Sequence, residues 1–173
     1  MPHWANPVIP VGTYSCAALA VELTDLLTNV DRPDDDADGA DVMVGGDGSD
    51  TASYFRRLTP LRVTLDGAAN DGAVGENDQA GVPQGPLGRP DVENVNGGMG
   101  NDVLIGTSGP NFLVSRIGAD TIHGLGGADT IDVRDRDRDS AWNDVVDAGD
   151  GPDYCAANRT DDLTSCEEIF FGS

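Results

Sequence analysis

Acidic residues recur every nine residues over much of the chain, and this spacing could do metal chemistry. From Gly97 the chain reads GGMGNDVLI, GTSGPNFLV, SRIGADTIH and GLGGADTID without a gap. In these nonapeptides the fourth residue is Gly, the sixth is Asp or Asn, and the eighth is Leu or Ile. Ca²⁺ takes carboxylate and carbonyl oxygens as ligands, whereas Zn²⁺ would require His or Cys. The repeat therefore points to a hard cation held by oxygen.

The same frame extends on both sides of these four units. Units 36–44, 45–53 and 88–96 precede them, and three more units follow after an insertion. Across the ten units the sixth position is Asp eight times, Glu once and Asn once. A disordered acidic tract would not hold three residue types in one frame. The candidate metal ligands at the sixth position are Asp41, Asp50, Asp102, Asn111, Asp120, Asp129, Asp144, Asp153 and Asp162.

Short strands and tight turns must position these acids. Positions seven to nine predict a strand whose eighth side chain points inward, because strand residues alternate between faces. The glycines of positions one to five permit turns with positive φ. Two nonapeptides then make one coil of about 18 residues, and ten units make about five coils. A core with one aliphatic residue per unit cannot offset the ordering entropy alone, so something else must hold the turns.

The pattern resembles the nonapeptide repeats of the repeats-in-toxin (RTX) family, most closely at GGDGSD (45–50) and GGMGND (97–102). The resemblance implies an all-β fold, a right-handed parallel β-roll, with several Ca²⁺ ions between successive turns. The ligands would be the sixth-position carboxylates and turn carbonyls, including those of Gly46, Gly48, Gly98 and Gly100. This picture couples Asp102 with Asp120, Asn111 with Asp129, and Asp144 with Asp162. For each acid the alternative is a turn residue that binds its own backbone without metal.

The frame divides the chain into three parts. Residues 1–35 are expected to be a cap or assembly arm, 36–165 the roll with an insertion at 54–87, and 166–173 a C-terminal cap. Residues 15–30 are compatible with an amphipathic helix, and a strand fits nearly as well. In the insertion, residues 61–65 alternate as a strand. The loop that follows is either an irregular calcium loop that uses Asp71 and Asp78 or a solvated acidic turn.

Composition excludes several functions. The chain carries 31 Asp and Glu against 10 Arg, for a net charge of −21, so nucleic-acid binding is not expected. No apolar run is long enough for a membrane span. Cys155 and Cys166 could form a disulfide that leaves Cys16 over. Metal and cysteine chemistry favour an extracellular protein, although no signal peptide is visible.

These observations predict a binding protein and not an enzyme. His123 stands at the ninth, outward position of a repeat, and no nucleophile motif accompanies it. The leading hypothesis is a secreted structural or adhesive protein that folds on Ca²⁺ and assembles through residues 1–30 into a filament or matrix. The alternative is a calcium-stabilised accessory module of a larger secreted enzyme.

Overall fold

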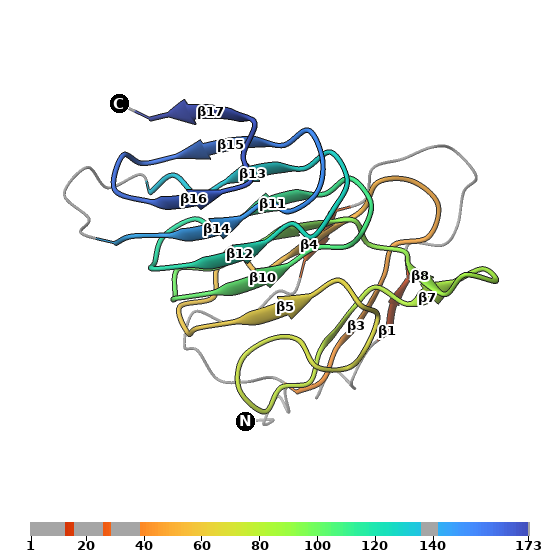
Figure 1. Cartoon of the computed structure of the whole chain (residues 1–173). Coiled ribbons are helices and arrows are strands. Elements are labelled where there is room, and N and C mark those ends of the chain that lie inside the picture. The colour runs from red at the N-terminus through yellow and green to blue at the C-terminus, as the bar shows by residue number, and fades with distance from the viewer. Residues whose placement is uncertain (1–12, 16–25, 29–38, 136–141, 173) are drawn as a thin grey trace, which may run out of the picture.

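The computed structural model describes residues 13–15, 26–28, 39–135 and 142–172, and within these ranges the protein contains strands and no helix. The strands are short because each nonapeptide spends most of its length on a turn. A seven-stranded sheet runs in the order β17-β15-β13-β11-β9-β4-β2, a five-stranded sheet in the order β16-β14-β12-β10-β5, and a three-stranded sheet in the order β1-β3-β6 (Figure 1). All pairs within these sheets are parallel, which confirms the all-β parallel β-roll.

The strand bounds follow the repeat. The seven-stranded sheet contains β2 (Leu26–Thr28), β4 (Thr51–Ser53), β9 (Asn94–Asn96), β11 (Phe112–Val114), β13 (Thr130–Asp132), β15 (Tyr154–Ala157) and β17 (Glu168–Phe171). The five-stranded sheet contains β5 (Arg62–Thr64), β10 (Val103–Ile105), β12 (Thr121–His123), β14 (Val145–Asp147) and β16 (Asp162–Thr164). The three-stranded sheet contains β1 (Thr13–Ser15), β3 (Val42–Val44) and β6 (Gln79–Ala80), and β7 (Pro83–Gln84) forms an antiparallel hairpin with β8 (Arg89–Pro90).

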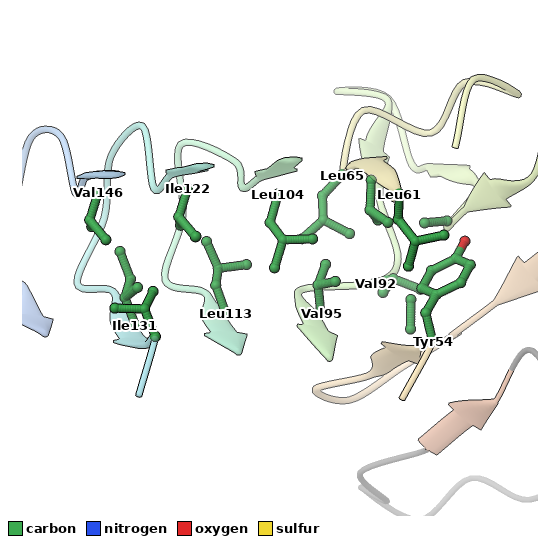
Figure 2. Packing of buried hydrophobic residues seen from close by; sticks show 14 of the residues in the cluster. Tyr54, Leu61, Leu65, Val92, Val95, Leu104, Leu113, Ile122, Ile131 and Val146 are labelled. Carbon is green, nitrogen blue, oxygen red and sulfur yellow. The ribbon is translucent and has the colours of Figure 1, made fainter. Parts of the chain in front are cut away.

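The eighth-position residues build the core, as the repeat predicts. Leu104, Ile122 and Val146 from the five-stranded sheet face Val95, Leu113 and Ile131 from the seven-stranded sheet across a narrow interior (Figure 2). All six are at most 1% exposed. Each residue also stacks on its counterpart in the neighbouring coil, as Leu104 does on Ile122. The core is therefore one aliphatic layer on each side, continuous along the stack.

The insertion at 54–87 contributes strands to the roll. β5 lies within the strand predicted at 61–65, and it pairs Val63 with Leu104. β6 pairs with β3, so the loop before it occupies the place of a turn. Residues 56–64 and 73–81 thus act as two degenerate repeats, in which Val63 and Ala80 hold the inward position and are fully buried. The sequence frame missed both units because most of their glycines are absent.

The N-terminal segment differs in part from the prediction. The helix expected over 15–30 is wrong at Leu26–Thr28, which pairs in parallel with β4, so the strand alternative holds there. Pairing with a strand covers an edge of the sheet that would otherwise stay open. Residues 16–25 and 29–38, with Cys16 among them, and the first twelve residues of the proposed arm lie outside the described residues. The described residues contain no helix long and apolar enough to cross a membrane.

At the C-terminal end, the Cys155–Cys166 disulfide is confirmed, with 5.9 Å between the two Cα atoms. It ties β15 to the segment that leads into β17. By the chain-entropy model a loop of this size contributes about 2–3 kcal/mol. β17, which pairs in parallel with β15, thus lies within the segment expected to be a cap.

Candidate calcium sites

Several turns of the roll share a backbone conformation with positive φ, although Gly98, Gly100 and Gly109 do not adopt it. The second position has positive φ in several repeats, with values of 93° at Gly46, 83° at Arg116, 75° at Leu125 and 96° at Gly149. The fourth position is also positive, with 145° at Gly118 and 147° at Gly151. Non-glycine residues adopt such conformations at a cost. The repeat places glycine where the turn demands it, and Arg116 and Leu125 are exceptions that carry strain.

Successive turns approach each other through backbone alone. A Cβ atom on Gly118 would overlap the carbonyl oxygen of Gly100, and one on Gly151 would overlap that of Gly127. The same holds for Gly127 against the backbone of Gly109. Carbonyl oxygens of one turn therefore face the next turn with no side chain between them. This is the cradle that a cation between two turns requires.

The sixth-position acids form two columns along the roll. In each column, the Oδ1 atom of one acid accepts a hydrogen bond from the backbone N–H of the sixth-position residue one coil earlier. The donor–acceptor distances are 2.7 Å for Asp102 to Asp120, 2.8 Å for Asn111 to Asp129, 2.8 Å for Asp120 to Asp144 and 2.8 Å for Asp129 to Asp153. The structure thus places Asp120 against Asp102 and Asp129 against Asn111, as the repeat predicts. It also continues both columns past residues 133–138, which separate the repeat units 124–132 and 139–147.

The second oxygen of these carboxylates has a different environment. In the described part of the chain, the Oδ2 atoms of Asp120, Asp129, Asp144 and Asp153 are buried and have no hydrogen-bond partner. The four residues are at most 1% exposed. A buried carboxylate oxygen without a partner costs free energy, and native proteins supply a donor or a cation. We call these four residues the column acids; each offers one oxygen to a ligand that is not part of the chain.

Burial raises the pKa of several sixth-position carboxylates. It raises the pKa of Asp102 to about 7, that of Asp129 to about 6 and that of Asp144 to about 8, although backbone amides partly offset the effect. The neighbouring acid in the column adds to the rise, as Asp120 does for Asp144. A divalent cation beside these carboxylates would favour the charged form and remove the penalty.

The donor set fits Ca²⁺. Among the described residues no three His, Cys, Asp or Glu side chains converge on one point, so side chains alone do not complete a metal site. A column acid together with turn carbonyls supplies oxygen ligands only. Flexible oxygen coordination by carboxylates and carbonyls is what Ca²⁺ takes, and it offers nothing to a thiophilic metal. The column acids and the stacked carbonyls would hold the ion.

In the last coil, one predicted acidic position is wrong. β14 pairs with β16 so that Val146 meets Leu163, one residue earlier than the frame expects. Asp161 therefore occupies the acidic position, and its Oδ1 accepts the N–H of Asp144 at 3.2 Å. Asp162 is the exposed first residue of β16, so its coupling with Asp144 is wrong. The shift arises because the loop before β16 is one residue shorter than the regular repeat.

Sequence reasoning also missed Glu167. Its Oε2 atom accepts the N–H of Asp153 at 2.8 Å, in the manner of the next column acid. Glu93 does the same for Asp50 at 3.0 Å. The last coil is short, because Cys155 pairs with Ile169 only 14 residues later, and this places Glu167 in register; the one signal in the sequence is the cysteine beside it, Cys166.

Asp41 and Asp78 belong to the three-stranded sheet. The Oδ1 of Asp78 accepts the N–H of Asp41 at 2.9 Å, so Asp78 stands at the sixth position of the degenerate repeat 73–81. Asp71 is different, because its two oxygens accept the backbone N–H groups of Thr64 at 2.6 Å and Ala80 at 2.8 Å. No observation tests its predicted role as a calcium ligand, and these two hydrogen bonds argue against that role.

Two sixth-position residues of the regular repeat also form their side-chain hydrogen bonds with protein groups. Asp102 accepts the N–H of Leu61 at 3.0 Å and that of Gly98 at 2.7 Å. It lies against the turn of the degenerate repeat 56–64, which contains no glycine. Asn111 accepts the N–H of Thr107 at 2.7 Å and donates to the carbonyl of Glu93 at 2.6 Å. Their side-chain oxygens are therefore less available to a cation than those of the column acids.

The glycines predicted as ligands lie in turns at the N-terminal side of the stack. Gly46 and Gly48 have φ of 93° and 137°, and the N–H of Gly46 donates to Asp91 at 3.0 Å. Gly98 and Gly100 pack against the backbone of residues 57–60 so closely that a Cβ would meet it at 2.6–2.7 Å. Whether their carbonyls bind metal stays a prediction.

Comparison with known families agrees with this geometry. The RTX calcium-binding nonapeptide repeat matches the chain in four copies, over residues 36–52 and 96–131. RTX nonapeptide repeats bind several Ca²⁺ ions, and the matched ranges contain Asp120 and Asp129. No curated protein matches the chain significantly. The protein is therefore a calcium-binding repeat protein that carries RTX nonapeptide repeats on a parallel β-roll.

Proposed function

We propose that this protein is a secreted structural or adhesive protein whose β-roll folds when Ca²⁺ binds. The observation that carries the proposal is the set of four buried Oδ2 atoms on the column acids, which have no hydrogen-bond partner in the described part of the chain. Each Oδ2 atom destabilises the fold without an ion and would become a metal ligand when an ion binds. Binding free energy then becomes folding free energy.

The charge balance supports the same proposal. At a net charge of −21 the chain repels itself, and its thin aliphatic core gives little to oppose that repulsion. Ions between turns would neutralise the columns in the interior, where screening by salt is weakest. Without calcium we expect a largely disordered chain, and with calcium at extracellular concentrations a folded roll.

The disulfide supports an oxidising, extracellular setting. Cys155 and Cys166 are joined, and structural disulfides persist mainly outside the reducing cytosol. Extracellular fluid also supplies the millimolar calcium that weak sites need. A repetitive roll whose parallel sheets extend along the stack suits a structural or adhesive role, and residues 1–30 would serve as the assembly arm. The second candidate is a calcium-stabilised accessory module of a larger secreted enzyme, which the same fold would serve.

Far-ultraviolet circular dichroism tests the calcium switch. We expect EDTA to abolish the β signal, Ca²⁺ to restore it, and Mg²⁺ at the same concentration to restore little of it. The double variant Asp129→Asn/Asp144→Asn should need at least about tenfold more Ca²⁺. Asp66→Asn, an exposed acid of the insertion, is the matched control and should leave the midpoint unchanged. A β signal indifferent to both EDTA and Ca²⁺ would contradict the proposal.

Light scattering in Ca²⁺ separates the two uses of the fold. Large ordered assemblies that dissolve in EDTA support the structural or adhesive role. A strict monomer under the same conditions favours the accessory module. The calcium switch itself is independent of this result.

A further inference from the structure

Within the described residues, β17 has an open edge. β17 is the terminal strand of the seven-stranded sheet, and no described strand lies beyond it (Figure 1). All four of its residues are exposed, and three are large and apolar: Ile169 at 43%, Phe170 at 49% and Phe171 at 40%. Ile169 continues the inward row after Cys155, which is fully buried. An apolar edge strand of this kind is a template for pairing with another strand.

The backbone of β17 also has donors on its open side. The N–H groups of Glu168 and Gly172 donate to the carbonyls of Asp153 and Ala157, at 3.0 Å each. Because N–H directions alternate along a strand, the N–H groups of Ile169 and Phe171 point away from β15. The disulfide holds the segment before β17 to β15, so the edge is presented in a fixed position.

The two ends of β17 carry opposite charges. Glu168 opens the strand and is exposed. At the other end the guanidinium of Arg159 lies 5.5 Å from the centre of the Phe171 ring, and Arg159 is also exposed. Neither charge has an ion-pair partner among the described residues. Arg134, which lies 5.6 Å from the Phe170 ring, is by contrast paired with Asp132 at 2.6 Å.

We propose that β17 binds a second copy of this chain, with the two β17 strands antiparallel about a twofold axis. Pairing through the outward N–H groups sets Ile169 opposite Phe171. This orientation brings the end of each β17 that carries Glu168 next to the end of the other that lies by Arg159, so opposite charges approach each other twice. A parallel in-register pairing would instead bring like charges together, which is destabilising. The pairing would use the outward N–H groups and cover the exposed Ile169 and both phenylalanines. This interface is separate from the assembly arm and goes beyond the calcium switch.

Charge-swap variants of the full chain test the interface in saturating Ca²⁺. Sedimentation equilibrium should give twice the 18.0 kDa mass of the chain, with dissociation at high dilution. Glu168→Arg or Arg159→Glu alone should weaken the dimer at least about tenfold, because each places like charges together. The double variant Glu168→Arg/Arg159→Glu should restore it. Phe171→Pro, which removes an outward N–H, should also weaken it.

The controls separate this interface from folding. Phe112→Ser removes an aromatic residue of similar exposure, 46%, from the interior strand β11 and should leave the dimer intact. Circular dichroism of every variant in Ca²⁺ reports whether the roll has formed, so loss of the calcium switch is seen separately from loss of the dimer. A folded wild-type monomer at the highest soluble concentration would overturn the proposal. So would a dimer that either single charge reversal leaves unchanged.

Discussion

Buried acids in two regions of the molecule are satisfied in opposite ways. In the segment 54–91, Asp71 accepts two backbone N–H groups, and Asp91 accepts those of Gly46 at 3.0 Å and Val82 at 2.6 Å. Glu76 forms a buried ion pair with Arg57. In the regular roll each column acid accepts one N–H and leaves its other oxygen without a partner in the described structure. The first region supplies its own donors to Asp71, to Asp91 and to Oε2 of Glu76, although Oε1 of Glu76 has no hydrogen-bond partner among the described residues. The second region depends on an external cation.

This difference explains where glycine is required. The degenerate repeat 56–64 has no glycine in its turn and places Arg57 where the regular repeat has its second glycine. The buried guanidinium supplies a fixed positive charge beside Glu76. The regular turns have glycines and stacked carbonyls instead, which leaves room for an ion. We infer that calcium holds the regular roll, whereas protein groups hold the insertion.

Replacing one turn glycine by alanine in each region should give the largest difference between the two regions in the free energy of unfolding. Gly151 of the roll has φ 147°, and a Cβ there would overlap the carbonyl of Gly127, whereas Gly75 of the insertion has φ 92° and open space around it. We expect Gly75→Ala to cost about 1 kcal/mol, the price of the backbone conformation. Gly151→Ala should cost about 3 kcal/mol or more, because the turns must also separate. Urea unfolding in saturating Ca²⁺ measures both, and equal losses would refute the stacked-turn geometry.

Removing one carboxylate charge from each region tests the two kinds of acid. Asp144→Asn keeps an oxygen for the N–H of Asp120 but loses the free carboxylate oxygen, so we expect about one ion fewer per chain at saturation. Asp71→Asn replaces one of two acceptors, which should lower the free energy of unfolding by about 1–3 kcal/mol and leave the ion count unchanged. Equilibrium dialysis and urea unfolding give the two readouts. If Asp71→Asn loses an ion while Asp144→Asn does not, the assignment is reversed.

Acid should act on the roll in opposite directions with and without calcium. The carboxyl groups of Asp102, Asp129 and Asp144 have folded pKa values of about 7, 6 and 8 without metal, above the unfolded value of 3.8. The calcium-free fold therefore binds protons more tightly than the unfolded chain and loses stability as pH rises through 6–8. In EDTA we expect the β signal to grow as pH falls from 8 to 5.

With calcium present, the same protons compete with the ion. The calcium midpoint should rise as pH falls from 8 to 5, by up to about tenfold per pH unit for each site that must lose a proton. A calcium midpoint independent of pH would argue against buried column acids as ligands. The exposed carboxylates of the surface would show no such dependence above pH 5, because their ordinary pKa values lie lower.

The smallest expected effect concerns strained turn residues. Leu125 in the roll has φ 75° and Asn77 in the insertion has φ 62°. Leucine tolerates this conformation poorly and asparagine tolerates it well. Leu125→Gly should therefore stabilise the protein by up to about 1 kcal/mol, and Asn77→Gly should change little. Thermal unfolding in Ca²⁺ compares them, and a destabilised Leu125→Gly would show that its side chain contributes packing that outweighs the strain.

The repeat predicts the regular part of the roll because each position has a physical task that only a few residue types perform. Leu104, Leu113, Ile122 and Ile131 are buried as expected, and the couplings of Asp120 and Asp129 follow from the nine-residue period. Prediction ends where the period breaks. The loop before β16 is one residue short, which moves the acidic position from Asp162 to Asp161. Glu167 enters its column because the final coil is short, with Cys155 paired to Ile169 only 14 residues later.

The nine-residue frame did not identify the repeats in the insertion, for a different reason. Amides and Arg57 satisfy both oxygens of Asp71 and one oxygen of Glu76, so its turns need neither the glycines nor the regular aspartate spacing that define the repeat. Val63 and Ala80 keep only the inward position. One apolar residue in nine is too weak a signal to find a repeat by sequence alone. Long-range hydrogen bonds such as that from Gly46 to Asp91 also have no local pattern.

A crystal structure at saturating Ca²⁺, with the ions located by anomalous scattering, tests the central claim most directly. We predict ions between successive turns of the regular roll, with the Oδ2 atoms of Asp120, Asp129, Asp144 and Asp153 at about 2.3–2.6 Å. No ion should bind Asp71, whose two oxygens accept backbone hydrogen bonds. Ions found only at exposed acids such as Asp47 or Asp66, with the four Oδ2 atoms away from any metal, would contradict the account.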